Sequence, residues 1–273
     1  MTVAGPATRV AAVVSMGKTG TNTLAATLRA TLPSTTPVLH MHSIQRGRAQ
    51  RRIDRARAEG VEPNPIFLDA VAAADWLAMD PPVPFNVVTA VRDPMTRHVS
   101  AFFQNITKHV TDLPAAPVIS ELLATNASAT EVREHGQYDD VMNGLAAGWR
   151  SFHDVDGTAW FRRELEGPFG FDILSVPFDT DRGVSTFTAG PHNLLVIRVE
   201  DMRERLEGAL SAHFGVTVDK VTRANEASNK RYSGLYEVFL GWLATQDLAV
   251  DTYYETPYAR HFYTDEQRAA LRA

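Results

Sequence analysis

Apolar residues near the start of the chain form a short run that passes through a polar turn into a helical pattern. Residues 9–15 are a Val/Ala run bounded by polar residues, which is typical of a buried parallel strand. In residues 21–32, Leu24, Leu28 and Leu32 recur at i, i+4 and i+8, the apolar stripe of an amphipathic helix. This order predicts the opening of a βαβ unit.

Later apolar runs extend the same alternation of strands and helices. Further strands are predicted at residues 37–42, 85–91, 171–178 and 194–200. Further helices are predicted from Pro94 to about residue 108, at 202–214, at 233–244, and after the capping-box spacing that begins at Thr264. Residues 179–191 have loop or hairpin chemistry, and residues 111–148 are read as helical pieces that cover the active site.

The alternation predicts an α/β fold with a central, mostly parallel sheet covered on both faces. No internal repeat and no persuasive domain boundary interrupts the 273 residues. A content of 44% apolar and 22% charged residues is that of an ordinary globular protein with a sizeable core.

Charge and cysteine content narrow the chemistry. A net charge of −5 gives the whole chain no attraction for nucleic acid or an anionic membrane, so any anion binding must be local. The absence of cysteine excludes disulfides, thiolate zinc sites and a cysteine nucleophile. No apolar run is long enough to span a bilayer and residues 1–9 lack a signal-peptide pattern, so a cytoplasmic enzyme is expected.

A glycine-containing turn joins the first predicted strand to the first predicted helix. Its residues, Gly17 to Thr23, combine two glycines that let the backbone curl, one lysine charge and three threonine hydroxyls. Backbone N–H groups at such a junction lie at the positive end of the helix dipole, so the turn predicts an anion site. A polar turn without a ligand is the alternative.

The common phosphate-binding loop of ATPases fits this turn only in part. Gly17-Lys18-Thr19 matches the end of a Walker A motif, but that motif needs a glycine five residues earlier, where the chain has Ala12. It also pairs with a strand that ends in a magnesium-binding aspartate, whereas the strand at 85–91 ends at Arg92. Both differences disfavour an ATP-dependent enzyme.

Two stretches resemble sulfotransferases that use 3′-phosphoadenosine 5′-phosphosulfate (PAPS). Lys18-Thr19-Gly20-Thr21 resembles the 5′-phosphosulfate loop of that family. In "VRDPMTRHVSAFF", Arg92 follows a strand, Pro94 comes two residues later and Ser100 eight residues later, as in the family. The resemblance implies that Arg92 and Ser100 bind the 3′-phosphate, and that Arg97 either joins them or only orients the loop.

A third stretch resembles a different bacterial group. Asn229-Lys230-Arg231-Tyr232-Ser233 is similar to the Asn-Lys-Trp-Tyr-Ser signature of capsular polysaccharide synthesis proteins related to sulfotransferases, with Arg in place of Trp. The resemblance implies that Lys230 and Arg231 clamp the nucleotide. A charged helix turn that faces water is an equally good explanation.

The resemblance implies in-line transfer of a sulfuryl group from PAPS, leaving the product PAP, with no metal needed. Lys18 would lie near the oxygen that bridges sulfur and the 5′-phosphate. The nucleotide-binding residues implied are Gly17, Thr19, Gly20, Thr21, Asn22, Thr23, Arg92, Ser100, Lys230 and Arg231.

A hydroxyl acceptor needs a general base, for which histidine is best suited near neutral pH. His40 and His42 lie two residues apart at the end of a predicted strand, so both project from one face. Ligands of α/β folds gather beyond the carboxyl ends of strands, which favours His42 over His40. Asp69 is another candidate, and both histidines can also be ordinary half-buried residues.

Arginines crowd the stretch that follows the histidines, and Arg48, Arg51, Arg52 and Arg55 share one face at helical spacing. An acidic acceptor would suit this patch, although a solvated helix face is the favoured explanation.

The prediction as a whole is a single sulfotransferase domain over residues 1–273, with a P-loop-like three-layer fold. Its acceptor would be a hydroxyl of a carbohydrate, lipid or specialised metabolite, with no nucleic-acid partner and no membrane span. The alternatives are a P-loop kinase and a catalytically silent sulfotransferase-like binding protein in polysaccharide assembly.

Overall fold

A computed structural model describes residues 9–152, 157–222, 231–246 and 251–272. These residues form two compact units, and each unit draws on three segments of the chain. The first takes its described residues from Met1–Arg92, Asp156–Ala224 and His261–Thr264, and the second from Asp93–Val155, Asn225–Arg260 and Asp265–Ala273. The single sulfotransferase domain expected over residues 1–273 stays a prediction. A division by contacts does not decide whether the two units work together as one functional domain.

The described part of the first unit contains a five-stranded sheet in the order β2-β1-β3-β5-β4. Its strands are β1 Val10–Val14, β2 Val38–Met41, β3 Phe85–Val91, β4 Val184–Ala189 and β5 His192–Arg198. β1, β2, β3 and β5 pair in parallel, and only β4 runs antiparallel, in a hairpin with β5. The predicted α/β class with a mostly parallel sheet is therefore confirmed.

One predicted strand is wrong. Residues 171–178 form turns and irregular backbone, and the edge strand β4 instead lies inside the stretch at 179–191 that was read as a loop or hairpin. Phe171, Ile173 and Phe178 are buried. These residues are apolar because they pack in the interior, and not because they pair in the sheet. The ring of Phe178, for example, packs on the ring of Phe262, with centroids 5.2 Å apart. Alternating apolar residues alone do not distinguish the two cases.

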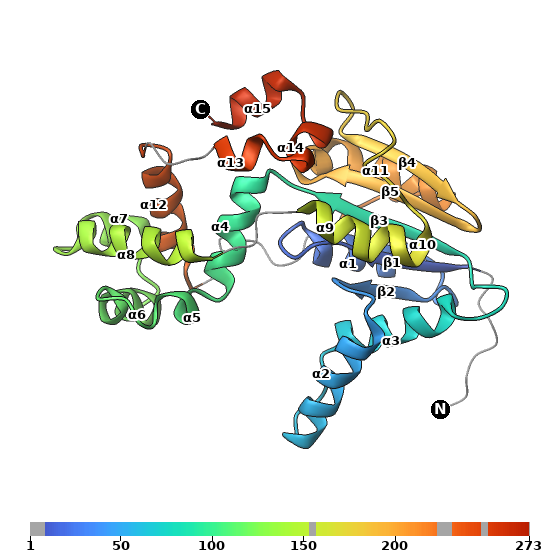
Figure 1. Ribbon diagram of the computed structural model, residues 1–273, viewed down its shortest axis with the longest axis horizontal. Helices are drawn as coiled ribbons and strands as arrows, with labels where there is room; N and C mark the ends of the chain where they lie inside the picture. The colour runs from blue at the N-terminus through green and yellow to red at the C-terminus, as the bar shows by residue number, and fades with distance from the viewer. Residues whose placement is uncertain (1–8, 153–156, 223–230, 247–250, 273) are drawn as a thin grey trace. The chain divides into compact units, whose positions relative to one another are not determined.

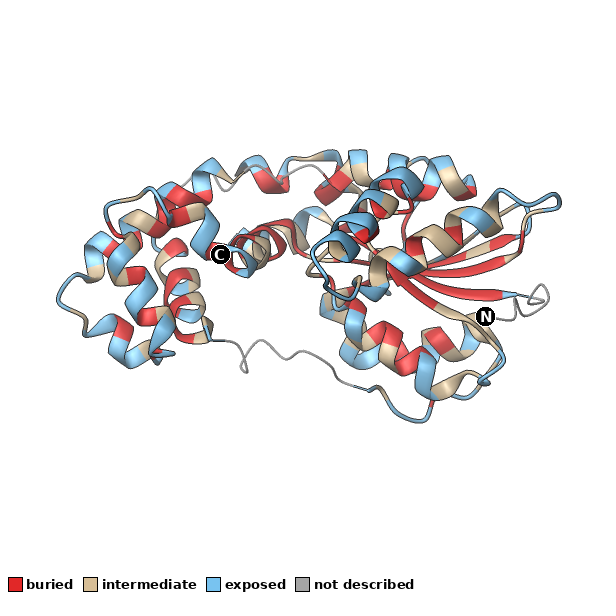
Figure 2. Ribbon diagram, turned by 90° about the horizontal axis from the view of Figure 1, so that it is seen from below, coloured by how far each residue is buried: buried red, intermediate tan, exposed pale blue. Residues whose placement is uncertain are grey.

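Helices cover both faces of the sheet (Figure 1). One face buries a core that comprises Val88 and Ala90 of β3, Leu24 and Leu28 of α1 (Thr21–Thr31), and Leu206 and Leu210 of α11 (Met202–Phe214). On the other face, Phe85 contacts Trp76 of α3 (Pro65–Leu77) and Phe169 of α10 (Gly167–Phe169). Because side chains alternate along β3, its even and odd positions serve different layers. Figure 2 shows most residues of β1, β2, β3 and β5 as buried, whereas those of the edge strand β4 are intermediate or exposed.

The remaining described elements of the first unit lie around this sheet. They are α2 Arg46–Ala58, α9 Gly157–Phe161, the π-helix η1 Arg162–Glu166 and the 3-10 helix η2 Val199–Asp201. α14 Pro257–Phe262 includes residues of both units.

The second unit is helical throughout its described residues. Its helices are α4 Pro94–Gln104, α5 Ile106–Val110, α6 Ala116–Ala124, α7 Ala129–Arg133, α8 Tyr138–Ser151, α12 Ser233–Leu243, α13 Asp251–Tyr254 and α15 Asp265–Arg272. The helix predicted from Pro94 to about residue 108 ends earlier, because Asn105 separates α4 from α5. Phe102, Phe103 and Phe239 form the aromatic centre of its core.

Among the described helices, none combines the length and the apolar character needed to cross a bilayer.

Candidate functional site

The turn between β1 and α1 has an unusual backbone. Lys18 and Gly20 both lie in the left-handed region, with φ of 73° and 72°. For a residue with a side chain this conformation costs roughly 1–3 kcal/mol, and such strain is concentrated at ligand-binding and active sites. Left-handed residues bend the chain so that neighbouring N–H groups turn toward one side, which is how backbone concavities bind anions. The two left-handed residues give the turn a bend that the predicted anion site would use.

Two buried hydroxyl groups hold this turn against the sheet. Ser15 Oγ donates to Ala90 O of β3 at 2.9 Å and accepts from Ala90 N at 3.1 Å. Thr19 Oγ1 donates to Met16 O at 2.7 Å and lies 2.7 Å from Ser15 Oγ. The Thr19 side chain is fully buried and its hydroxyl is engaged inside the turn. We therefore expect Thr19 to support the shape of the turn and to meet a ligand only through its backbone.

The N-terminus of α1 is prepared for an anion in two further respects. Its N-cap residue is Gly20, which has no side chain that caps the helix, and its first turn carries no acidic residue. The positive end of the helix dipole is therefore not neutralised by a carboxylate of that turn. Asn22 is exposed there, Thr23 is half-buried and Thr21 is buried.

Arg92 connects the second predicted motif to this turn. It follows the last residue of β3, and its Nη1 atom donates to Lys18 O at 3.1 Å. The contact places a guanidinium directly beside the Lys18 turn, at the carboxyl end of the central parallel strands. Polar groups that gather at this edge lie where α/β folds bind their ligands.

Three further residues predicted to bind the nucleotide come from later parts of the chain. Ser100 is half-buried on α4 and Arg231 is exposed in a turn before α12, both in the second unit. Lys230 lies outside the described residues. The roles of these three residues stay predictions.

His42 lies just beyond the end of β2 and is held on two sides. Its Nδ1 atom is 2.7 Å from Ser15 O, and its own carbonyl accepts a hydrogen bond from Trp160 Nε1 at 2.9 Å. A carbonyl oxygen can only accept, so Nδ1 carries the proton of this hydrogen bond. In the neutral ring the Nε2 atom then has the lone pair that a general base needs. Trp160 was not predicted from the sequence.

His40 offers a different environment, although the two rings meet edge to face with centroids 5.4 Å apart. Burial, followed by the charges of His42 and Arg29, lowers the pKa of His40 to about 4. Such a low pKa makes the ring a poor proton acceptor at neutral pH. The Asp69 carboxylate accepts a hydrogen bond from the His40 backbone N–H at 2.8 Å, and burial raises its pKa. The geometry favours His42 over His40.

Glu164 fixes the segment that follows His42, and sequence reasoning missed it. This side chain is fully buried on the π-helix η1, and its carboxylate accepts from Ile44 N at 2.7 Å and from Ser43 Oγ at 3.1 Å. Arg163 Nε donates to the same carboxylate at 2.7 Å. In the sequence, Glu164 lies in a charged stretch that does not indicate burial. A single π-helical turn is also too short to give a repeating pattern of apolar and polar residues. Single-turn π-helices are frequent at functional sites.

Replacing Glu164 with alanine is expected to destabilise the protein. The variant leaves the buried Ile44 N–H and the Ser43 hydroxyl without this acceptor, and each orphaned group costs about 1–3 kcal/mol. Urea unfolding measures the loss. Glu166→Ala is the matched control, because Glu166 lies in the same π-helix and is exposed. A Glu164 variant as stable as the Glu166 variant would contradict the assigned role.

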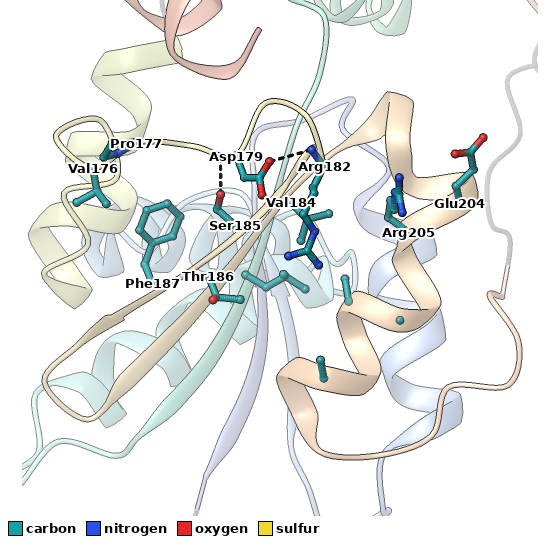
Figure 3. A pocket seen from close by; sticks show the side chains of 14 residues that line it. Val176, Pro177, Asp179, Arg182, Val184, Ser185, Thr186, Phe187, Glu204 and Arg205 are labelled. Carbon is teal, nitrogen blue, oxygen red and sulfur yellow. Dashed lines mark hydrogen bonds between the residues drawn. The ribbon is translucent and has the colours of Figure 1, made fainter. Parts of the chain in front are cut away.

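Two cavities in the described part of the first unit are lined in part by α11. One of about 350 Å³ opens beside the first turn of α1 and is lined by Thr23, Met202 and Lys220 among others. Another, of about 610 Å³, lies between β4 and α11, where Arg182 N donates to Asp179 Oδ1 at 2.9 Å (Figure 3). The larger cavity is at the edge of the sheet opposite β2, and none of the residues predicted for the site lines it.

Comparison with protein families gives one match. The model of a family described as "Putative capsular polysaccharide synthesis protein" matches residues 150–264. This segment contains Asn229–Ser233, so the resemblance predicted from that signature is confirmed. It also contains Trp160 and Glu164, but it begins after Lys18 and Arg92 and covers less than half of the chain. Neither the curated proteins nor the solved structures gave a significant match.

Proposed function

We propose that this chain is a PAPS-dependent sulfotransferase whose acceptor is a hydroxyl group of a carbohydrate. The observation that carries the proposal is the hydrogen bond from Arg92 Nη1 to Lys18 O, because it joins the two stretches that resemble sulfotransferases at one edge of the sheet. The matched family concerns polysaccharide synthesis, which favours a carbohydrate over the other acceptor classes.

The residues of the turn fit the donor. PAPS, when bound, supplies an activated sulfuryl group. The N–H groups from Gly20 to Thr23 lie at the uncapped N-terminus of α1 and would bind the 5′-phosphate, with Lys18 adding its charge. Arg92 would bind the 3′-phosphate as a planar fork of donors, together with Ser100. By the resemblance, Lys230 and Arg231 would clamp the nucleotide.

Lys18 would stabilise the charge that develops as the sulfur–oxygen bond breaks. A sulfuryl group carries less negative charge than a phosphoryl group, so an ammonium and backbone donors can take the place of magnesium. His42 would then accept the proton of the acceptor hydroxyl at Nε2, while its Nδ1–H stays on Ser15 O. Alignment of donor and acceptor supplies the rest of the catalysis.

A kinase is the competing enzyme, and one contact speaks against it. Asp93 comes two residues after the last residue of β3, the place along the chain where a kinase or ATPase would hold its magnesium. The Asp93 carboxylate instead accepts from Met95 N at 3.4 Å and from Thr96 N at 2.9 Å as the N-cap of α4. This carboxylate therefore already has a structural role.

Calorimetric titration of the full chain with PAP, and separately with ATP and Mg²⁺, tests the proposal. We expect PAP to bind more tightly than ATP, and radiolabelled PAPS to transfer its label to a carbohydrate hydroxyl. Tighter binding of ATP would favour the kinase. Tight binding of PAP without transfer to any acceptor would favour a binding protein in polysaccharide assembly.

Arg92→Ala is expected to weaken PAP far more than adenosine 5′-phosphosulfate, which lacks the 3′-phosphate. Hydrogen bonds to a charged group contribute about 1.5–3 kcal/mol, which corresponds to a roughly 10- to 100-fold loss of affinity for PAP. Arg92→Lys is the companion variant, because it keeps the charge and removes the fork. Equal losses for both nucleotides would mean that Arg92 only shapes the turn through Lys18 O.

A further inference from the structure

The helix that follows His42 is strongly basic in a chain of net charge −5. α2 has six arginines among its 13 residues, and all six are exposed: Arg46, Arg48, Arg51, Arg52, Arg55 and Arg57. Only Ala49 and Ile53 of this helix are buried. Figure 1 shows α2 beside α3 on the β2 side of the first unit.

Two of these arginines have carboxylate partners and four do not. Arg46 Nε lies 2.6 Å from Asp75 Oδ1, and Arg55 Nε lies 2.7 Å from Glu59 Oε1. Within the part of the chain that the structure describes, the other four form no ion pair; they are Arg48, Arg51, Arg52 and Arg57. Four guanidinium groups without an ion pair on one short helix can therefore meet an anionic partner.

Two of the unpaired arginines line a groove between α2 and α3. The groove has a volume of about 180 Å³, and its walls include Ser43, Gln45, Arg48, Arg52, Ile66 and Phe67. Arg48 and Arg52 are four residues apart, so they lie on the same side of α2. Ile66 and Phe67 provide an apolar and aromatic wall. A space of this size suits one small ring rather than a folded segment.

The groove begins next to the candidate base. Ser43 lines it and follows His42 directly in the chain, so their Cα atoms are about 3.8 Å apart. Ser43 is fixed by its hydrogen bond to Glu164. A chain-like ligand with one ring in the groove would therefore have its neighbouring ring near His42.

We propose that Arg48 and Arg52 bind a carboxylate-bearing sugar in this groove, which makes the acceptor an acidic polysaccharide. The inference rests on the proposed function and adds the charge of the acceptor. Guanidinium forks bind carboxylates with two parallel hydrogen bonds, and the ring of Phe67 can pack on the apolar face of a sugar. A ring-sized groove with an apolar wall fits a saccharide better than the uniform phosphate backbone of a nucleic acid.

Calorimetry with a glucuronic acid hexasaccharide and a neutral glucose hexasaccharide tests this binding on the full chain. We expect the acidic sugar to bind and the neutral sugar to bind at least tenfold more weakly. Arg48→Ala/Arg52→Ala is expected to lower the affinity for the acidic sugar by at least tenfold. Arg46→Ala/Arg55→Ala removes the same charge from the same helix, but from arginines with partner acids, and is expected to have a much smaller effect.

Three results would overturn the inference: equal binding of the two sugars, equal losses in the two double variants, or tighter binding of a single-stranded oligonucleotide than of the acidic sugar. PAP titrated in parallel separates this inference from the proposed function. Tight PAP binding without binding of the acidic sugar refutes only the acceptor assignment. Binding of the acidic sugar without PAP binding refutes the sulfotransferase and leaves the groove assignment supported.

Discussion

Lys18→Ala is expected to lower kcat for sulfuryl transfer by about 10²- to 10³-fold, the loss typical of removing one donor that stabilises developing charge. Lys18 follows Gly17 in a strained turn, and its carbonyl accepts a hydrogen bond from Arg92. Its backbone therefore helps to shape the turn, and under the proposed function its ammonium would stabilise the developing charge. Steady-state kinetics with saturating PAPS measure the loss.

Lys18→Gly separates these two contributions. Glycine adopts the φ of 73° without strain, so this variant is expected to be at least as stable as Lys18→Ala in thermal unfolding. Both variants lack the ammonium, and both should lose turnover to a similar extent. If Lys18→Gly kept nearly full activity, Lys18 would matter only for the backbone, and the assigned catalytic role would be wrong.

His42→Ala is expected to lower kcat by at least about 100-fold, because a positioned general base contributes about 10²- to 10⁴-fold. His42→Asn is the sharper variant. Its side-chain amide can donate to Ser15 O as Nδ1 does, so the turn keeps its contact while the base is lost. We expect the two variants to lose similar activity, with His42→Asn closer to the parent protein in stability.

A comparison of the two histidine variants is a second test of the base. A smaller loss in His42→Ala than in His40→Ala would move the role of the base to His40, despite its pKa of about 4.

Local patterns predicted much of the first unit. The buried run at residues 85–91 is β3 from end to end, and the leucine stripe that begins at Leu24 marks α1. These patterns succeed because the central strands are buried on both faces and the helices on one, so each leaves its own period in the sequence. The strand–turn–helix order around Lys18 was also predicted, and the use of that turn as an anion site stays a prediction.

The features that the sequence patterns did not predict depend on contacts between segments far apart in the chain. Glu164 is buried because Ile44 N and Ser43 Oγ, about 120 positions earlier, supply its hydrogen bonds. Phe178 is apolar and buried, as a strand residue would be, but it packs against the ring of Phe262 from a distant part of the chain. The contacts that define the two units are also of this kind, since the chain enters and leaves each unit more than once. A pattern among neighbouring residues does not show which distant segment a side chain will contact.

The order of the sheet also bears on how the chain is synthesised. β3 is made early, but the neighbour that covers its second side, β5, is made about a hundred residues later. Until then the valine-rich edge of β3 is open, and open strand edges of this kind readily pair with other chains. A nascent or truncated chain that stops before His192 should therefore be prone to self-association, and ribosome-bound chaperones would have a defined interval in which to act.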